Sequence, residues 1–339
     1  MQSPIFFNLD APEALKSYLK QQTWLAEDEV VNQITKAGEG NMNFVARIHT
    51  NQRTLIFKQS RPWVEKYPQF EAPVERIESE VAFYNAVQIY PVIRTGMPTL
   101  IAFNNPTKCA LFEDLGEVED YANLYDNDLA PLEEIQQLVG WLSALHNAEF
   151  AEELKPALSN KAMRQLNHAH LYDIPLQPDN GMPLDDITPG LQQEAQQLQE
   201  NAAYRQAIQS LGELYLASGA TLLHGDFYPG SWVRTDSGPQ VIDPEFTFFG
   251  PASYDIGVCL AHLLMAGYSF EAIRKILTVY QKPAGFEIKQ AYQFAGMEIM
   301  RRLIGVAQLP LTRDIEEKKA LLRQSETLVL DPDVFDLLG

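Results

Sequence analysis

Three acidic residues stand at the two ends of one short predicted β-hairpin. Asp226 precedes its first strand (residues 232–235), and Asp243 and Glu245 lie at the end of its second strand (residues 240–243), after the turn sequence Asp-Ser-Gly. Because antiparallel pairing brings these ends together, we expect the carboxylates to lie side by side. One carboxylate can accept a proton from a substrate hydroxyl while another binds a hard divalent cation. Phosphoryl transfer needs that division of labour, together with positive groups on the phosphates.

The composition of the chain excludes several classes of function. Its formal net charge of −19 argues against a nucleic-acid partner, which requires clustered Lys and Arg, and suits an acidic surface or a cationic substrate. No apolar run reaches the ~18 residues of a membrane span, and the first twenty residues lack the pattern of a signal peptide. Cys109 and Cys259 match no metal or redox spacing. We therefore expect a cytoplasmic protein with reduced, packed cysteines and neither a membrane nor a nucleic acid as partner.

The elements that must position the hairpin change in character along the chain of 339 residues. The first part predicts strands at 29–35, 44–50, 54–60, 99–105 and 109–116, with an amphipathic helix at 72–90. The second part predicts helices at 131–150, 190–217, 251–268, 269–282 and 286–309. The sequence thus predicts an α+β fold with a small β-rich lobe (1–115) and a larger helical lobe (116–339) that contains the hairpin.

Several segments together resemble a known family. The sequences HGDFYPGSW (224–232) and IDPEF (242–246) are similar to the catalytic loop and metal-binding segment of the aminoglycoside phosphotransferase and choline kinase superfamily, small-molecule relatives of the protein kinases. The sequences GEGNMNFVARI (38–48), VIDPEFTFFGPASYDIG (241–257) and MEIMRRLIGVAQL (297–309) look like the corresponding segments of 5-methylthioribose kinases. The resemblance implies a bilobal protein-kinase-like fold and transfer of the γ-phosphoryl group of ATP to a small-molecule hydroxyl.

The resemblance also implies a role for each matching residue of the catalytic segments. The implied roles are general base for Asp226, stabilisation of the transferred phosphoryl group for Arg301 and Arg302, and Mg²⁺ binding, direct or through water, for Asp243, Glu245 and Ser231. His224 and Asp255 are expected to support the catalytic loop rather than to take part in the chemistry.

On the nucleotide side, Lys58 is expected to reach the α and β phosphates. An acid of the following helix would pair with it, either Glu80 or Glu78, and the helical spacing favours Glu80. The remaining candidates for ATP binding are the loop residues Gly38, Gly40, Asn41 and Asn43, and Glu113 and Leu115 of the segment that links the lobes.

The acceptor is the least determined part of the expectation. Residues 227–229 read Phe-Tyr-Pro where the methylthioribose kinases have Leu-His-Thr, so the reaction carries over better than the substrate. A sugar such as 5-methylthioribose is the first expectation, an aminoglycoside or amino alcohol the alternative, and a nucleotide-binding pseudokinase the second alternative. The family also implies a homodimer. Candidates to line the acceptor pocket are Tyr228, Trp232, His168, His170 and Tyr172.

Overall fold

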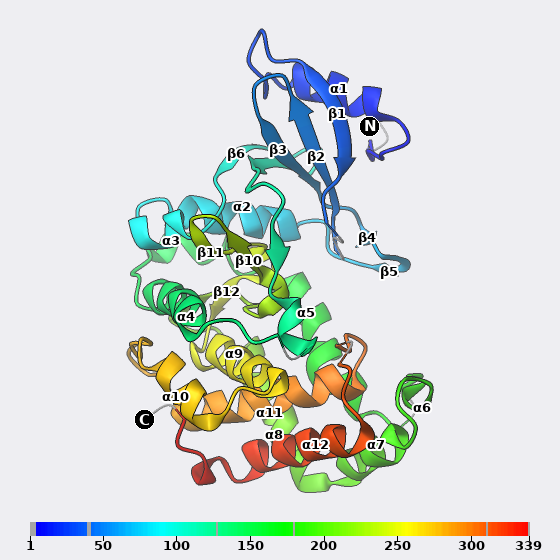
Figure 1. Cartoon of the computed structure of the whole chain (residues 1–339), viewed down its shortest axis with the longest axis vertical. Helices are drawn as coiled ribbons and strands as arrows, with labels where there is room; N and C mark the ends of the chain where they lie inside the picture. Colours follow the sequence, from blue (N-terminus) through cyan, green and yellow to red (C-terminus); the bar gives the residue numbers. More distant parts are fainter. Residues whose placement is uncertain (1–4, 39–41, 127, 179, 310, 338–339) are drawn as a thin grey trace.

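A strand-rich lobe stands on a larger helical lobe, and the chain passes from one to the other after strand β7 (Figure 1). The computed structural model describes residues 5–38, 42–126, 128–178, 180–309 and 311–337. The arrangement confirms the α+β, bilobal expectation, and the division at residues 115 and 116 stays a prediction.

The small lobe is built on one antiparallel sheet. Its strand order is β1-β2-β3-β7-β6, and every neighbouring pair is antiparallel. Because successive side chains of a strand point to opposite faces, Phe57 of β3 enters the core beneath helix α1, whereas Lys58 faces helix α2. The strands are β1 (Val31–Lys36), β2 (Phe44–Thr50), β3 (Thr54–Gln59), β6 (Leu100–Asn104) and β7 (Cys109–Glu113).

Within the described part of this lobe, three helices and one hairpin complete the structure, and of these only the α2 region was predicted. The predicted helix 72–90 begins later and ends earlier than expected, because Pro91 starts a separate short helix. The hairpin of β4 and β5 extends from the sheet beside the helical lobe (Figure 1). These elements are α1 (Pro12–Gln21), α2 (Arg76–Val87), α3 (Pro91–Thr95), β4 (Trp63–Val64) and β5 (Tyr67–Glu71).

The helical lobe is centred on α9, whose residues are all buried, and on α11, which packs beside it. One continuous apolar core joins these helices to α2 of the small lobe. The helices are α4 (Leu132–His146), α5 (Lys161–His168), α6 (Leu184–Ile187), α7 (Leu191–Glu200), α8 (Ala202–Leu216), α9 (Ser253–Ala266), α10 (Phe270–Leu277), α11 (Ile288–Ile304) and α12 (Ile315–Leu330).

The prediction of one helix over 190–217 was wrong. Helix α7 ends and α8 begins at Asn201, which has an extended backbone and whose Oδ1 accepts a hydrogen bond from the Tyr204 backbone N–H at 3.1 Å. An Asn side chain competes with the helix for backbone donors and therefore favours a cap over an interior position. The composition of the segment, rich in helix formers, concealed this break.

The predicted hairpin is present, with a slightly different second strand. Strands β10 (Trp232–Thr235) and β11 (Gly238–Val241) pair with each other, and β8 (Glu119–Asp120) adds a third strand beside β10. A second small sheet pairs β9 (Thr221–Leu223) with β12 (Phe248–Gly250). The catalytic-loop sequence therefore leaves β9 and enters β10, and the acidic segment leaves β11 and enters β12.

Single-turn helices fill the remaining connections. They are η1 (Ala122–Asp126), η2 (Glu152–Leu154), η3 (Ala169–Asp173, a π-helical turn), η4 (Ile174–Leu176), η5 (Pro229–Ser231), η6 (Pro244–Phe246) and η7 (Pro332–Val334).

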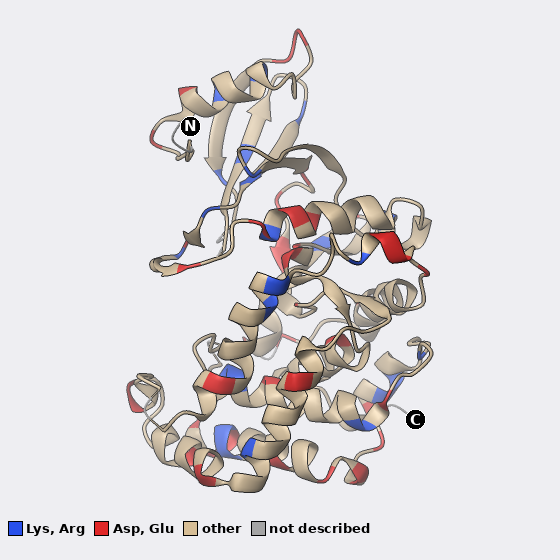
Figure 2. Cartoon of the chain, turned by 180° about the vertical axis from the view of Figure 1, so that it is seen from behind, with Lys and Arg blue, Asp and Glu red and all other residues tan. Residues whose placement is uncertain are grey.

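Three further features concern the surface and the composition of the chain. Acidic residues are distributed over both lobes, with Lys and Arg between them (Figure 2). None of the helices within the described ranges is long and apolar enough to cross a membrane. Cys109 and Cys259 are buried free thiols.

Candidate active site

Lys58 lies between the two lobes and pairs with an acid from each. Its Nζ is 2.7 Å from Glu80 Oε1 on α2 and 2.5 Å from Asp243 Oδ1 in the helical lobe. Burial by itself would lower the pKa of Lys58, but the carboxylates of Asp243 and Glu80 raise the pKa well above its usual value. The geometry confirms Glu80 as the partner, since Glu78 instead pairs with Lys108.

The loop between β1 and β2 is tied to the acidic segment by a buried arginine that the sequence analysis did not identify. Arg76, at the start of α2, is fully buried, and its Nε donates to Asn43 Oδ1 at 3.0 Å. Asn43 in turn donates to Glu245 Oε2 at 2.8 Å, which also lies 3.4 Å from Arg76 Nε. The terminal nitrogens of Arg76 donate to the carbonyl groups of Met42, Arg61 and Pro73. Only its place in an apparently ordinary amphipathic helix was visible in the sequence.

The glycine loop itself is only partly described. Gly38 has a left-handed backbone (φ 65°), which suits glycine. Gly40 and Asn41, both expected to bind ATP, lie outside the described residues.

Two groups of hydrogen bonds fix the catalytic-loop sequence, one made by Asp255 and one by His224. The Asp255 carboxylate on α9 accepts hydrogen bonds from the backbone N–H groups of His224 (2.7 Å) and Gly225 (3.0 Å). His146 of α4 lies 3.2 Å from the same carboxylate. The buried His224 donates through Nε2 to the Ile242 carbonyl at 3.0 Å, because a carbonyl oxygen can only accept. Both residues thus have the supporting role expected of them.

Close backbone packing brings the catalytic loop against the acidic segment. Gly225 has φ 86°, and a Cβ atom there would lie 2.2 Å from the Phe246 carbonyl oxygen. Only glycine permits both the conformation and the approach. This contact, together with the His224 bond to Ile242, places the loop that carries Asp226 against the segment that carries Asp243 and Glu245. That the three carboxylates lie side by side stays a prediction.

Asp226 faces the two arginines of α11. Its Oδ1 lies 3.9 Å from Arg301 Nη2 and 3.8 Å from Arg302 Nη2, and its side chain is one-quarter exposed. Burial raises the pKa of Asp226 to about 6, against the lowering effect of Arg302 and Arg301. A carboxylate with this pKa ionises near neutral pH and can still accept a proton, which is the property of a general base.

Asp243 has the geometry of an exposed hard ligand. Its side chain is 49% exposed, and its backbone is left-handed (φ 61°), which is uncommon for a residue other than glycine and is tolerated best by Asn and Asp. Glu245 follows two residues later in η6 and is largely buried against Asn43 and Arg76. Two such carboxylates fit Mg²⁺, which in nucleotide sites takes one or two carboxylates together with water and phosphate oxygens. Ser231 is buried beside them, with its backbone bonded to Ile242 and Tyr228.

The segment linking the lobes is fixed by an arginine of the sheet. Arg47 on β2 lies 2.8 Å from Asp114 Oδ2 through its Nε and also donates to the Gly116 carbonyl. Glu113 ends β7 with an exposed side chain, which accepts a hydrogen bond from the Thr99 backbone at 3.0 Å. Leu115 is half-buried. The adenine-binding role of Glu113 and Leu115 stays a prediction.

The structure separates the five candidates for the acceptor pocket. Tyr228 lies beside the proposed chemistry, since the Arg302 guanidinium stacks 4.5 Å above its ring. Trp232 does not line the pocket: it is fully buried in the core against Tyr121 and Phe227, because as the first residue of β10 it points inward.

The other three candidates lie at the end of α5 and in η3. Tyr172 is buried against Tyr215 and stacks on His168. His168 pairs with Asp173. Burial and the nearby Arg301 lower the pKa of the half-buried His170, and Arg301 also acts on the pKa of the buried Tyr172, which burial raises.

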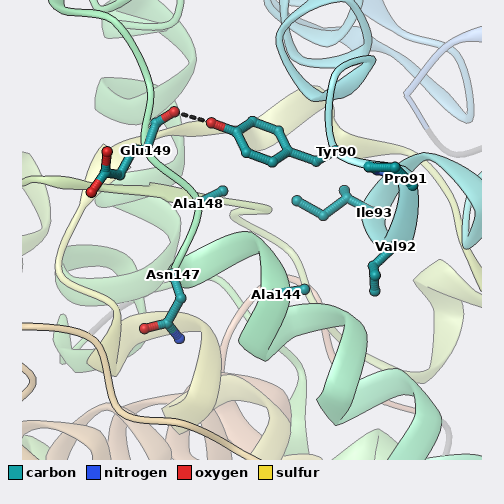
Figure 3. Close-up of a pocket in the computed structure, with 8 residues that line it drawn as sticks. All are labelled: Tyr90, Pro91, Val92, Ile93, Ala144, Asn147, Ala148 and Glu149. Carbon is teal, nitrogen blue, oxygen red and sulfur yellow. Dashed lines mark hydrogen bonds between the residues drawn. The ribbon is translucent and has the colours of Figure 1, made fainter.

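A surface hollow between α3 and α4 lies apart from these residues (Figure 3). The Tyr90 hydroxyl donates across it to the Glu149 carbonyl. None of the predicted site residues is among those that line it, which are Tyr90, Pro91, Val92, Ile93, Ala144, Asn147, Ala148 and Glu149.

Comparison with known proteins agrees with this geometry. The chain is 26% identical over 328 residues to a methylthioribose kinase of Exiguobacterium sibiricum, covering 83% of this chain and 80% of that protein. It is 24% identical over 356 residues to a methylthioribose kinase of Bacillus pumilus, covering 87% of this chain and 86% of that protein.

Solved structures share the fold at lower identity. A choline kinase from Cryptosporidium parvum matches 96% of this chain and 98% of its own with a TM-score of 0.57 and 14% identity. A spectinomycin phosphotransferase in complex with ADP and spectinomycin matches with a TM-score of 0.53 and 11% identity, covering 95% of this chain and 98% of its own. Family classification gives the same result, since the phosphotransferase enzyme family matches residues 33–292. With the two lobes, the lysine between them and the acids of the hairpin in place, the chain belongs to the phosphotransferase enzyme family.

Proposed function

We propose that this protein is a cytoplasmic, Mg²⁺-dependent kinase that transfers the γ-phosphoryl group of ATP to a hydroxyl of 5-methylthioribose or a closely related thiosugar. The observation that carries the proposal is the arrangement around Asp226. The base has two guanidinium groups within 3.9 Å on one side, and the acidic segment touches its loop on the other. The names of the relatives support the choice of a thiosugar.

The side chains of this protein divide the reaction between them. Asp226 would orient the acceptor hydroxyl and take its proton as the new bond forms. Arg301 and Arg302 would stabilise the negative charge of the phosphoryl group in transfer. Lys58 would bind the phosphates, and its present partner Asp243, with Glu245, would hold Mg²⁺. When bound, the ion would neutralise the negative charge of the phosphates.

The two arginines favour a neutral or anionic acceptor over a cationic one. Their guanidinium groups lie within 3.9 Å of Asp226, which the acceptor must approach. Among the described residues, the acids that pair with them are Glu298 and Asp226. An aminoglycoside or amino alcohol would bring a further positive charge to this place. We therefore rank the cationic acceptor second despite the acidic overall charge of the chain.

The deciding experiment is coupled ADP release with Mg·ATP and a panel of acceptors: 5-methylthioribose, ribose, other pentoses, choline, homoserine and an aminoglycoside. Rapid release with a thiosugar alone is expected. Release with a cationic acceptor alone would move the protein to the second candidate. ATP binding without release for every acceptor would favour a nucleotide-binding pseudokinase, and light scattering on the same preparation tests the homodimer that the family implies.

A further inference from the structure

A chain of buried polar groups lies behind the two arginines and has no role in the chemistry described so far. Glu298 on α11 is fully buried, and His262 on the neighbouring α9 lies 2.8 Å from its Oε1. The hydroxyl of Tyr125, in η1, contacts the other ring nitrogen of His262, Nδ1. Tyr125 is buried as well. Three elements that are distant in sequence thus meet at one carboxylate.

The direction of each hydrogen bond follows from the chemistry of the groups. An ionised carboxylate can only accept, so His262 must carry its proton on Nε2 and donate it to Glu298. Burial lowers the pKa of His262 to about 4, so the ring is neutral and its Nδ1 accepts from the Tyr125 hydroxyl. Burial would raise the pKa of Glu298, but Arg301 and Arg302 hold it well below its usual value. The chain therefore runs from Tyr125 to His262 to an ionised Glu298.

The Glu298 carboxylate accepts hydrogen bonds from both arginines, in each case from the Nε atom. Its Oε2 accepts from Arg301 Nε at 2.5 Å, and its Oε1 accepts from Arg301 Nη2 at 2.9 Å and Arg302 Nε at 2.8 Å. The spacing of three and four residues along α11 places the two arginines over one carboxylate. Arg302 Nη2 lies 3.8 Å from Asp226 Oδ1, and Arg301 Nη2, which also donates to Glu298, lies 3.9 Å from it.

These hydrogen bonds to Glu298 also set the distance between the arginines and Asp226. If the arginines came closer to Asp226 than these distances, they would form direct hydrogen bonds with it. Such bonds would keep the Asp226 carboxylate ionised and occupied. Two buried guanidinium groups without Glu298 would have Asp226 as their nearest acid. Glu298 supplies a negative charge that competes with Asp226 for the two arginines. This competition leaves Asp226 available to a substrate hydroxyl.

We propose that Glu298, oriented by His262 and Tyr125, is a positioning residue that holds Arg301 and Arg302 for the transferred phosphoryl group and prevents them from closing onto Asp226. The inference rests on the proposed function, because it assigns a purpose to the arginines in that reaction. It differs from a role in stability alone by predicting a change in the titration of Asp226.

The charged groups that act on the titration of Asp226 come from two elements of the helical lobe. They are Arg301, Arg302 and Glu298 on α11 and Glu245 in η6, and the charge of Asp226 in turn raises the pKa of Tyr228 in the catalytic loop and of Tyr215 on α8. Of these, Glu298 acts to raise the pKa of Asp226 and the arginines act to lower it. Removing the charge of Glu298 therefore removes one raising effect and strengthens both lowering effects.

The test is the isosteric variant Glu298→Gln in the full chain. We expect kcat to fall about 10²-fold, the size of loss that misplaced catalytic groups produce, with a much smaller change in the KM for ATP, since in the proposal α11 meets the nucleotide only at its γ-phosphoryl group. We expect the acid limb of the kcat/KM profile to move about one unit to lower pH, because Asp226 loses a like charge and gains closer arginines. An unchanged kcat and acid limb would overturn the inference.

A matched control is Glu29→Gln in the small lobe. Glu29 is likewise a buried carboxylate that accepts from an arginine Nε, that of Arg53 at 2.9 Å. The Glu29→Gln variant should retain the kcat and the pH profile of the unsubstituted protein. The same loss and the same pH shift in both variants would contradict a specific role for Glu298.

Two further measurements keep the inference testable if Glu298→Gln does not fold. Tyr125→Phe removes one hydroxyl and keeps the ring; we expect a severalfold lower kcat and an acid limb shifted in the same direction. The ¹⁵N NMR spectrum of histidine-labelled protein should show His262 neutral at pH 7 with its proton on Nε2. An unchanged kcat and pH profile in Tyr125→Phe, or a proton on Nδ1 of His262, would contradict the proposal. The NMR result needs no acceptor, so a failure of the proposed function, seen as no turnover by the unsubstituted protein, is separately recognised.

Discussion

Asp243 combines an acidic side chain with a left-handed backbone, and both properties matter to its proposed role. Its carboxylate is half-exposed beside Lys58, while its φ of 61° turns the chain from β11 into η6. Asn tolerates the same conformation and has the same size, so a substitution to Asn separates the charge from the turn.

At this residue we expect Asp243→Asn to keep the fold and lose at least about 10²-fold in kcat, because a neutral amide binds a hard cation more weakly than a carboxylate does. Steady-state kinetics over a range of Mg²⁺ concentrations tests this, with the melting temperature as control. Full activity at ordinary Mg²⁺ concentrations would show that the ion is held elsewhere.

Asp226 permits an equally selective test. We expect Asp226→Asn to lower kcat by about 10²- to 10⁴-fold, the usual contribution of a general base, while the Kd for ATP changes little. Isothermal titration with ATP alongside the kinetic assay measures both. A variant with the full rate would remove Asp226 from the mechanism.

The same residue sets the expected pH dependence. Burial raises the pKa of Asp226 to about 6, and only the ionised form can accept a proton. We therefore expect kcat/KM to be level above about pH 7 and to fall as the pH decreases through about 6. A kcat/KM profile that stays level down to pH 5 would assign proton acceptance to another group.

At the scale of elements, the break between α7 and α8 is maintained by one side chain. Asn201 caps α8, and its amide also donates to Glu326 of α12 at 2.7 Å. We expect Asn201→Ala to reduce the free energy of unfolding by about 1 kcal/mol, the usual cost of a lost N-cap, with no change in kcat. Urea unfolding measures this, and Asn201→Ser, which keeps a capping oxygen, should recover part of the loss.

Helix α2 connects the sheet, the glycine loop and the helical lobe, and its first residue makes the connection. Arg76 binds the loop through Asn43 and Met42 and lies 3.4 Å from Glu245. Because the breaking of a buried ion pair costs about 3–5 kcal/mol, Arg76→Met is expected to destabilise the protein strongly. The milder Arg76→Lys tests function by raising the KM for ATP more than it lowers kcat.

At the scale of the whole molecule, the lobes meet through charges that a nucleotide would reorganise. Lys58 with Asp243, and Asn43 with Glu245, are contacts of this kind between the lobes. We expect Mg·ATP to stabilise the protein by about 2.7 kcal/mol at a concentration of 100 times its Kd. Thermal unfolding with ATP, with and without Mg²⁺, measures this, and Asp243→Asn should lose the Mg²⁺-dependent part. An equal shift without the metal would contradict Mg²⁺ binding at Asp243.

The sequence by itself indicated many of the strands and helices and the segments that carry chemistry, although it gave no sign of α1 or α12 and concealed the break between α7 and α8. Strands, helices and the acidic hairpin follow from local periodicity and turn residues, and these signals lie within ten or twenty neighbouring positions. The acidic hairpin pointed to Asp226, and the resemblance of segments in both lobes to a known family pointed to Lys58 before its surroundings were known.

The tertiary structure alone decided which of these residues meet. It selected Glu80 over Glu78 as the partner of Lys58, placed Trp232 in the core, and joined Arg76 to Glu245 and Glu298 to His262 across separate elements. No local pattern encodes such pairs, because a buried charge is identified only by the partner that compensates it. That partner is brought near by the packing of the whole chain.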